Sequence, residues 1–380
     1  MNWDQLETIK KGSIRELKKP DPGHPVYFVR LVLAHDRMQA DWDLVVKAES
    51  CAQGEATTQV SVHWGAKLMR HVSGGVKVKP LTRDEFTAFK EKAGQDSDFD
   101  DPANVWFKMP FLGGLTTGGM VVKGAGRSFD IDSGEKACKV AVKMLDANRW
   151  RELGKIAAVD IFIGNNDRFD VSGSPGWVEN TGNFMYSASG QMVGLDTFAR
   201  DGAISKLDQS VANLDFLKPL MDNNEGTRSQ FASRATESFA YKVRYAIEHD
   251  PKLEGKMEGP MSGVPVQQRK GVKYLNFAMR NPKMGGTELK AVPLADLEKI
   301  YAPFRGFFAD GIAVGAKELK TYLQIRFEKL NTSRARAFMA VRGGATYAPT
   351  PSMSAPKAPG EPFPAGVLER MSYLKWMPRQ

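Results

Sequence analysis

Cysteine is nearly absent from this chain, which has only Cys51 and Cys138, in different segments. No Cys-x-x-Cys pair and no Cys/His cluster occurs, which argues against a structural zinc site and favours a reducing compartment. No apolar run approaches the length of a membrane-spanning helix, so we expect no membrane span. The segment Met1–Glu7 lacks the positive start and apolar core of a signal peptide. We therefore expect a cytoplasmic protein, with delivery into another cell without a cleaved signal peptide as an alternative.

A long basic stripe with interleaved aromatic residues is also missing, although the net charge is +9 and the pI about 9.3. The positive residues are spread along the chain, which makes nucleic-acid binding the less favoured interpretation. An acidic ligand such as a nucleotide, or an acidic protein partner, fits the charge equally well. The 380 residues, 42% of them apolar, can bury a core large enough for two lobes or two domains.

The hydrophobic pattern changes along the chain from strands to helices. Strands are expected at 25–33, 43–48, 76–80 and 105–112, and helices at 59–71, 84–92, from 133 onward, at 151–163, 209–222, 228–248, 294–304 and 309–341. A hairpin is expected around Ser187–Gly190. This order predicts an α+β fold with a β-rich N-lobe over 1–112 and a mostly helical C-lobe over 113–342. The segment 343–380 is expected to be a tail, with a disordered Pro/Ala/Ser-rich linker to about residue 366 and a short amphipathic helix at 367–376.

Three polar side chains follow apolar runs in the middle of the chain. Asp167 follows Ile161–Asn166, Asn183 lies in a turn-like segment, and Asp196 comes directly after Met192–Leu195. Each has a simpler interpretation as a turn residue. Asp196 is the least ordinary of them, because a carboxylate that leaves a buried strand needs a metal or a strong partner.

The order of these residues fits phosphoryl transfer from a magnesium nucleotide. In such a site one carboxylate orients or deprotonates the acceptor hydroxyl, while an amide oxygen and a second carboxylate hold the metal. Asp167 is the candidate for the first role, and Asn183 and Asp196 are the candidate Mg²⁺ ligands, because Mg²⁺ prefers oxygen donors. Arg168 is a further candidate in the catalytic loop, with the alternative that it serves as an ion-pair partner.

Lys47 lies within an apolar strand, where it must reach solvent or meet an anion. It is the candidate for contacting nucleotide phosphates, with Glu55 as its carboxylate partner and Glu49 as the alternate. An ordinary edge-strand lysine remains the other interpretation.

The segment 105–112 is the candidate connection between the lobes, with the backbone near Lys108 and Met109 contacting an adenine edge; an ordinary core strand is the alternative. Neither G-x-G-x-x-G nor G-x-x-x-x-G-K-[ST] occurs. The best early phosphate-covering loop is therefore Lys10-Lys-Gly-Ser13, which makes Gly12 and Ser13 the candidates there.

Taken in order, these parts resemble a protein-kinase-like fold. Leu-Val-Val-Lys47 is similar to the kinase strand lysine, Asp167-Arg168 with Gly182-Asn183 to the catalytic loop, and Gly-Leu-Asp196-Thr to the metal-binding Asp-Phe-Gly. The nearest resemblance is to the phosphoinositide kinases and the actin-fragmin kinase family, whose loop also has Asn-x-Asp-Arg followed by Gly-Asn. It implies a bilobal fold that uses ATP and Mg²⁺. The sixteen positions from Asp167 to Asn183 and the Thr-Phe after Asp196 depart from ordinary protein kinases.

Three functions follow from these expectations. The first is an atypical kinase that phosphorylates a hydroxyl of a protein, with an actin-like target and an effector role as candidates. The second is a pseudokinase scaffold that binds protein partners. The third is transfer of AMP to a protein on the same fold.

Overall fold

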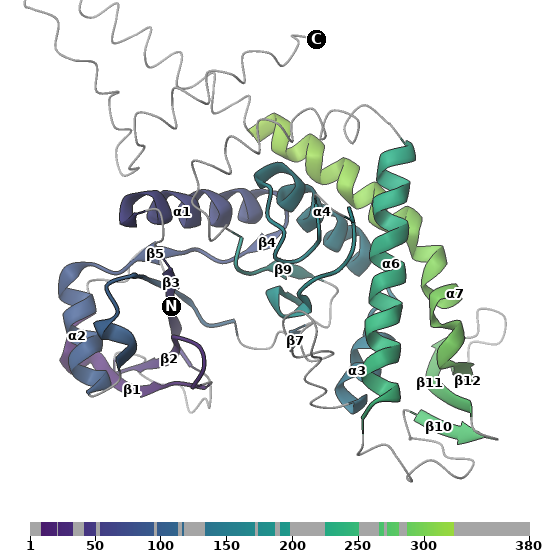
Figure 1. Ribbon diagram of the computed structural model, residues 1–380, viewed down its shortest axis with the longest axis horizontal. Helices are drawn as coiled ribbons and strands as arrows, with labels where there is room; N and C mark the ends of the chain where they lie inside the picture. The colour runs from purple at the N-terminus through teal and green to yellow at the C-terminus, as the bar shows by residue number, and fades with distance from the viewer. Residues whose placement is uncertain are drawn as a thin grey trace, which may run out of the picture. The chain divides into compact units, whose positions relative to one another are not determined.

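The computed structural model of the chain forms an α+β structure, as the sequence predicts (Figure 1). The structure describes residues 9–20, 22–32, 42–50, 54–94, 97–112, 116–117, 134–171, 174–186, 191–197, 225–250, 266–269, 272–280 and 287–322. The chain divides into two compact units. Unit 1 comprises Met1–Gly113, Thr197–Asp215 and Lys317–Gln380, and unit 2 comprises Gly114–Asp196 and Phe216–Ala316.

Unit 1 is built on a five-stranded sheet of order β1-β2-β3-β6-β5, in which all neighbours are antiparallel. The strands are β1 (Ile14–Lys18), β2 (Val26–Leu31), β3 (Leu44–Ser50), β5 (Lys79–Pro80) and β6 (Asn104–Pro110). The expected strands at 25–33, 43–48 and 105–112 are confirmed. Strand β1 was not expected, because its segment looked uniformly polar. Short elements complete the unit: η2 (Lys11–Ser13), η3 (Ser97–Asp100) and β4 (Gly74–Gly75).

Two helices cover opposite faces of this sheet. Alternate residues of a strand point to opposite faces; Trp106 of β6 joins the core cluster that contains Phe89 of α2 (Arg83–Ala93), whereas Phe107 packs with Val62 of α1 (Glu55–Val72). Figure 1 shows α1 and α2 against different sides of the sheet. Strand β6 is therefore buried on both faces, which explains its continuous apolar run.

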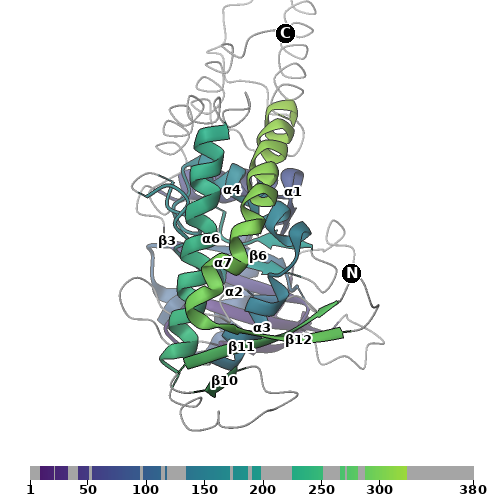
Figure 2. The ribbon, with the colours of Figure 1, turned by 90° about the vertical axis from the view of Figure 1, so that its right-hand side faces the viewer.

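Unit 2 has a helical core around α4 (Ala147–Ile163), which is buried along most of its length. The helices α3 (Gly134–Lys143), α6 (Glu225–Glu248) and α7 (Leu297–Tyr301) and the short turns η7 (Leu294–Asp296) and η8 (Ala302–Phe304) accompany it. A helical segment over 305–322 follows, of which residues 305–316 belong to unit 2. Figure 2 shows α6 running beside α7. Gly154 allows close packing here, since a Cβ at this position would lie 2.2 Å from the carbonyl oxygen of Phe308.

Two small antiparallel sheets belong to unit 2. The first contains β7 (Thr116–Thr117), β8 (Phe184–Tyr186) and β9 (Met192–Gly194), which confirms the expected pairing of the hairpin strands; Ser187–Gly190 lies outside the described residues. The second has the order β10-β11-β12 and consists of β10 (Val266–Arg269), β11 (Val272–Arg280) and β12 (Thr287–Pro293). The expectation of a mostly helical C-lobe over 113–342 is wrong at this second sheet, which lies between the expected helices at 228–248 and 294–304.

Several other expectations can be compared with the described residues. The helices at 84–92, 151–163 and 228–248 are confirmed as α2, α4 and α6. The expected helix at 209–222 and the tail 343–380 lie outside the described residues, and the lobe boundaries at 112 and 342 stay predictions. Among the helices that the structure describes, none is long and apolar enough to cross a bilayer.

Candidate functional site

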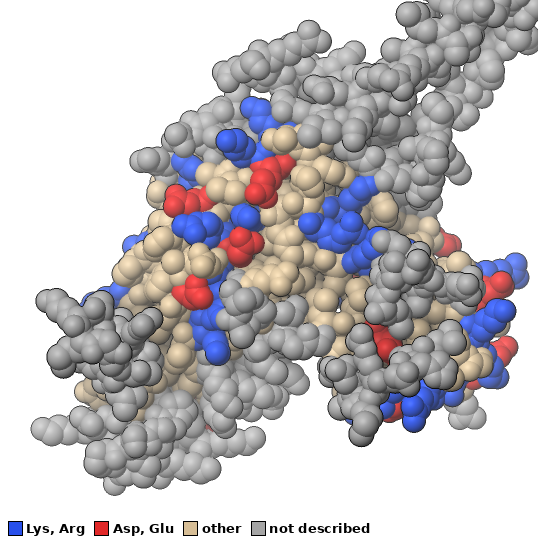
Figure 3. Space-filling view, turned by 180° about the vertical axis from the view of Figure 1, so that it is seen from behind, with Lys and Arg blue, Asp and Glu red and all other residues tan. Residues whose placement is uncertain are grey.

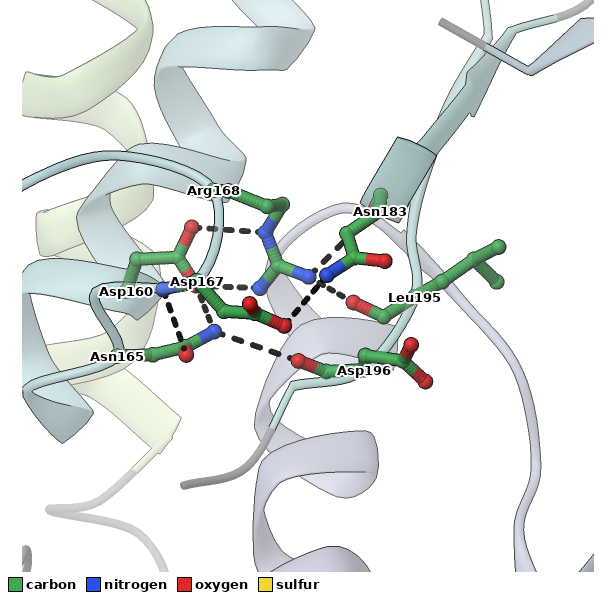
Figure 4. Close-up of polar contacts among 7 residues, drawn as sticks. All are labelled: Asp160, Asn165, Asp167, Arg168, Asn183, Leu195 and Asp196. Atoms are coloured by element: carbon green, nitrogen blue, oxygen red, sulfur yellow. Dashed lines mark hydrogen bonds and ion pairs between the residues drawn. The ribbon is translucent and has the colours of Figure 1, made fainter. Parts of the chain in front are cut away.

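The three central candidates of the sequence analysis meet in one cluster within unit 2 (Figure 4). Asp167 lies in the loop that follows α4, Asn183 ends the turn η5 (Thr181–Asn183), and Asp196 follows β9. Helix α4 begins at the N-cap Asp146 and ends at Gly164, which adopts the left-handed conformation (φ 67°) that glycine reaches without a Cβ penalty. This termination turns the chain so that the next residues face the ends of β8 and β9.

Asp167 and Asn183 contact each other directly. The Nδ2 group of Asn183 donates a hydrogen bond to Oδ2 of Asp167. Asn183 is nearly buried (8% exposed), whereas Asp167 is exposed at the surface. Because the amide nitrogen faces Asp167, the amide oxygen of Asn183 is turned away from it, toward the side on which Figure 4 also shows the carboxylate of Asp196.

Arg168 lies at the centre of the cluster and is fully buried. Its Nε and Nη2 groups donate to the two carboxylate oxygens of Asp160 in α4, the first at 2.8 Å, and its Nη1 donates to the carbonyl oxygens of Asn183 and Leu195. A guanidinium engaged on all sides in this way is a structural cation. The assignment of Arg168 to the catalytic group is therefore corrected: the alternative interpretation, an ion-pair partner, describes it.

Burial strongly affects the carboxyl group of Asp160, which has no exposed surface. Burial raises the pKa of Asp160 above its ordinary value, and the Arg168 guanidinium and the Asn165 amide oppose this shift. The nearby Asp167 carboxylate adds to the rise. The charged form of Asp160 is thus held by its two hydrogen-bonding partners against a large desolvation cost.

Asn165 is a second buried polar residue of the cluster, with 1% of its surface exposed. Its Nδ2 group donates to Oδ1 of Asp160 at 3.0 Å and to the carbonyl oxygen of Asp196 at 3.4 Å. Its Oδ1 accepts a hydrogen bond from the backbone N–H of Asp167 at 3.2 Å. These partners define which end of the amide is nitrogen and which is oxygen.

Asp196 has a backbone conformation that is unusual for its residue type. Its φ of 48° makes it the one non-glycine residue with positive φ in the described part of the chain. The left-handed conformation costs a non-glycine residue on the order of 1 kcal/mol and persists only where surrounding contacts impose it. The neighbouring backbone is held by the cluster, because Leu195 donates its N–H to the carbonyl of Asn183 at 2.8 Å.

The candidate nucleotide residues belong to unit 1, where Lys47 lies in β3 on the face that α1 covers. Its Nζ forms an ion pair with Oε1 of Glu49 at 2.7 Å, with 19% and 11% of the two side chains exposed. Glu55 lies exposed in the first turn of α1 and accepts a hydrogen bond from Gln59. The alternate partner, Glu49, therefore replaces Glu55 in this structure.

Lys108 has a different environment from the one expected. Its side chain is buried and forms an ion pair with Glu85 of α2, which has no exposed surface. Strand β6 pairs at Lys108 with β3 on one side and with β5 on the other, so this part of the backbone lies inside the sheet. The expectation that Lys108 presents its backbone to an adenine edge is wrong. Met109 pairs with Val45 of β3, and its adenine contact stays a prediction.

Gly12 and Ser13 form the 3-10 turn η2, and Gly12 does not use a positive φ. The hydroxyl of Ser13 donates to the carbonyl of Lys10 at 2.6 Å and accepts from its N–H at 3.0 Å. A closed turn of this kind leaves little of the Ser13 hydroxyl for a phosphate. The turn is exposed, so it does not show the extended glycine-rich loop that covers phosphates in kinases.

The charge on the surface is mixed. On the face in Figure 3, lysine and arginine groups lie near aspartate and glutamate groups in several places, with uncharged surface between them. Among the described residues, no group of three or more His, Cys, Asp or Glu side chains is placed to hold a metal. A metal site here would have to combine carboxylates with the amide of Asn183.

Comparisons with protein-family models, with curated proteins and with solved structures found no match to this chain. The case for a function therefore depends on the geometry of the cluster alone.

Two residues of the cluster, Asp160 and Asn165, were not among the sequence candidates. Asp160 carries a usable signal, because it is a single carboxylate within the apolar run Ala157–Ile163 of a helix, and a charge in that position requires a buried partner. Asn165 has no comparable signal: it precedes Asn166, and only the fold shows which of the two asparagines is buried.

Proposed function

We propose that the chain is a magnesium- and ATP-dependent phosphotransferase of the atypical kinase type, which phosphorylates a hydroxyl group of a protein substrate. One observation carries this proposal: Asp167, Asn183 and Asp196 come from three segments of the chain and lie together around one buried ion pair. The β8–β9 hairpin brings Asn183 and Asp196 close to each other, whereas the loop after α4 brings Asp167 to Asn183. The two-unit α+β fold is compatible with a bilobal kinase, and the kinase-like assignment is part of the proposal.

Asp167 is the proposed acceptor-side residue. Its carboxylate is exposed, while its backbone N–H and one carboxylate oxygen are fixed by Asn165 and Asn183. A carboxylate held in this way can orient an incoming hydroxyl group and take its proton as the bond to phosphorus forms. Arg168 does not take part in this step, because its guanidinium is already engaged by Asp160 and two carbonyl groups.

Asn183 and Asp196 are the proposed ligands of Mg²⁺. The donor set fits this ion, since Mg²⁺ is usually held by one or two carboxylates together with substrate phosphates. The hydrogen bond from Asn183 Nδ2 to Asp167 leaves the amide oxygen as the end of the side chain that can coordinate. When bound, the ion would neutralise charge on the transferred phosphoryl group. With so few protein ligands, we expect binding of Mg²⁺ to depend on the nucleotide.

Lys47 is the proposed phosphate contact in unit 1, paired with Glu49 rather than Glu55. Met109 stays a proposed adenine contact. One observation favours the competing scaffold function: the Gly12–Ser13 turn is closed on itself and leaves no glycine-rich loop among the described residues of this segment. In that case the fold would bind protein partners without turnover.

The decisive experiment uses the full chain with ATP labelled separately at the α- and γ-phosphates, incubated with a cell lysate. The proposal predicts that γ-label enters a protein. Transfer of α-label would instead indicate AMP transfer. Absence of both labels together with tight binding of ATP would overturn the phosphotransferase proposal in favour of the scaffold.

The roles of the two carboxylates can be separated with conservative variants. Asp167→Asn should lower kcat by about 10²- to 10⁴-fold, the usual range for a general base, and leave Mg-nucleotide affinity close to that of the parent protein. Asp196→Asn should weaken Mg-nucleotide binding itself. Asp310→Asn, at an exposed position on the segment 305–322, is the matched control and should change neither quantity. Unchanged nucleotide affinity in Asp196→Asn would contradict its assigned role.

A further inference from the structure

We propose that Asn165 is the positioning residue that fixes Asp196 and Asp167 relative to each other. The expected effect of this positioning on turnover rests on the proposed phosphotransferase function. The expected effect on the backbone of Asp167 and Asp196 does not. Among the described residues of the cluster, Asn165 is the side chain that contacts the backbone of both Asp167 and Asp196 (Figure 4).

The first step concerns the two peptide planes that flank Asp196. The carbonyl group before it, that of Leu195, accepts a hydrogen bond from Nη1 of Arg168. The carbonyl group of Asp196 itself accepts one from Nδ2 of Asn165 at 3.4 Å. The torsion angles φ and ψ of a residue describe how these two planes are rotated about its Cα. Holding both planes therefore holds Asp196 at its positive φ of 48° and fixes the direction of its Cα–Cβ bond.

The second step concerns how Asn165 is itself held. Its backbone N–H donates to the carbonyl of Asp160 at 2.8 Å, and its side-chain nitrogen donates to the Asp160 carboxylate at 3.0 Å. Asp160 belongs to the buried helix α4 and is clamped by Arg168. Every hydrogen-bonding group of the Asn165 amide is thus engaged. Because Asn165 is bound to the buried helix α4, it holds the backbones of Asp167 and Asp196 in place relative to that helix.

The third step is the consequence of removing the Asn165 side chain. Arg168 would still hold the carbonyl of Leu195, but the carbonyl of Asp196 would lose its donor within the cluster. Asp196 could then relax toward negative φ, which aspartate prefers. Its carboxylate would move away from the side of the cluster on which the amide oxygen of Asn183 also lies. The N–H of Asp167 would lose its acceptor at the same time.

The experiment compares Asn165→Ala with Asn166→Ala in the full chain. Asn166 is the adjacent asparagine; it is exposed, and its side chain accepts from the N–H of Val171 instead. Hydrogen exchange in the metal-free protein is measured first. Asn165→Ala should speed exchange in peptides that cover Asp167, whose N–H loses its acceptor, and Asn166→Ala should not. Equal exchange at Asp167 in Asn165→Ala and the parent protein would overturn the inference.

Binding of Mn²⁺ in the presence of AMP-PNP gives a second readout, by calorimetry. Loss of a residue that orients a metal ligand typically lowers metal affinity by about 10- to 100-fold, and we expect this for Asn165→Ala. In the Asp196→Asn background the same substitution should have almost no further effect, because Asn165 acts through Asp196. A purely structural role would leave the affinity of the folded protein unchanged, and that result would refute the inference.

Asn165→Ser provides a smaller change if the alanine variant does not fold, since a hydroxyl can still donate one hydrogen bond. It should show the same two effects at reduced size. The experiments distinguish a failure of this inference from a failure of the proposed function. If the parent protein transfers label from ATP and Asn165 substitutions leave exchange and Mn²⁺ affinity unchanged, only the inference fails. If no label is transferred but exchange changes as expected, the positioning role stands and the phosphotransferase proposal fails.

Discussion

Each of the two units contains a buried ion pair between a helix carboxylate and a cation from a neighbouring segment, and the two pairs differ in what surrounds them. In unit 1, Glu85 of α2 pairs with Lys108 and also accepts hydrogen bonds from the backbone N–H groups of Ile9 and Thr82, both at 3.0 Å. In unit 2, Asp160 of α4 pairs with Arg168, whose remaining nitrogen donates to two carbonyl groups. In the first pair the additional hydrogen bonds are made by the anion, Glu85, which accepts them from backbone N–H groups. In the second pair they are made by the cation, Arg168, which donates them to backbone carbonyl groups.

This difference separates an ion pair that stabilises a fold from an ion pair that also holds the backbone of the candidate site. Burial raises the pKa of Glu85, but the Lys108 ammonium and the two backbone N–H groups outweigh it, so the pKa lies below its ordinary value of 4.5. Burial raises the pKa of Asp160, and there the net shift is upward. Glu85 is thus stabilised as an anion where it lies, whereas Asp160 depends on Arg168. The carbonyl groups that accept hydrogen bonds from Arg168 belong to Asn183 and to Leu195, the residue before Asp196.

The largest predicted effect is the loss of Arg168. Arg168→Met leaves the Asp160 carboxylate buried without its cation, which should lower the free energy of unfolding of unit 2 by about 3–5 kcal/mol. Urea unfolding followed by hydrogen exchange can assign the loss to unit 2.

The double variant Asp160→Leu/Arg168→Met sharpens this test. Replacing both charges by apolar groups should recover part of the stability, because no unpaired buried charge remains. It should not restore Mn²⁺ affinity, since the carbonyl of Leu195 still lacks its donor. A double variant that recovers both properties would show that the ion pair has no positioning role.

A smaller effect is expected for Lys108→Met in unit 1. Glu85 would keep its two backbone donors, so we expect a loss of about 1–3 kcal/mol, the cost of an incompletely satisfied buried group. The Mn²⁺ affinity of the cluster in unit 2 should not change. A loss greater than that of Arg168→Met, measured under the same conditions, would reverse the comparison between the two pairs.

The sequence predicts the residues of the candidate site only in part. Asp196 was the strongest candidate, because a carboxylate that directly follows the apolar run Met192–Leu195 is expected to need a partner, and its role as a metal ligand stays a prediction. Asp167 and Asn183 were weaker candidates, since each also fits an ordinary turn. Lys108 was misinterpreted because its partner, Glu85, lies in the helix expected at 84–92, which is rich in charged residues and gives no sign that one of them is buried. Sequence spacing does not show that alternate residues of β6 face two different helices.

The fold was predictable where one local pattern dominated. The strands of the first sheet and the buried helix α4 follow from apolar runs and helical periodicity. The sheet β10-β11-β12 was missed because its strands mix charged and apolar residues, although Leu275, Phe277 and Met279 alternate along β11 with the period of a strand. Its pairing depends on contacts between segments, which one sequence does not display.

The decrease in the free energy of unfolding at acidic pH tests the environment of Glu85. Because the pKa of Glu85 is lower in the folded protein than its ordinary value of 4.5, its contribution is fully present above about pH 4.5. It is lost as the pH falls from there through the folded-state pKa. Glu85→Gln should therefore be less stable than the parent protein at neutral pH, and the difference should shrink below about pH 4.5. Urea midpoints measured at a series of pH values would check this, and a difference that grows on acidification would contradict it.

The smallest predicted effects compare the N-caps of α2 and α4. Thr82 accepts from the N–H of Glu85 at 3.3 Å in a capping box, and Asp146 accepts from the N–H groups of Asn148 and Arg149 at 2.8 and 3.4 Å. Substitution of either cap by alanine should cost about 1 kcal/mol. The two losses should differ in their consequence for function, because α4 carries Asp160 and leads into the loop of Asp167. Asp146→Ala should slightly speed exchange around Asp167, whereas Thr82→Ala should leave it unchanged; equal behaviour of the two variants would mean that the cluster is insensitive to the start of its supporting helix.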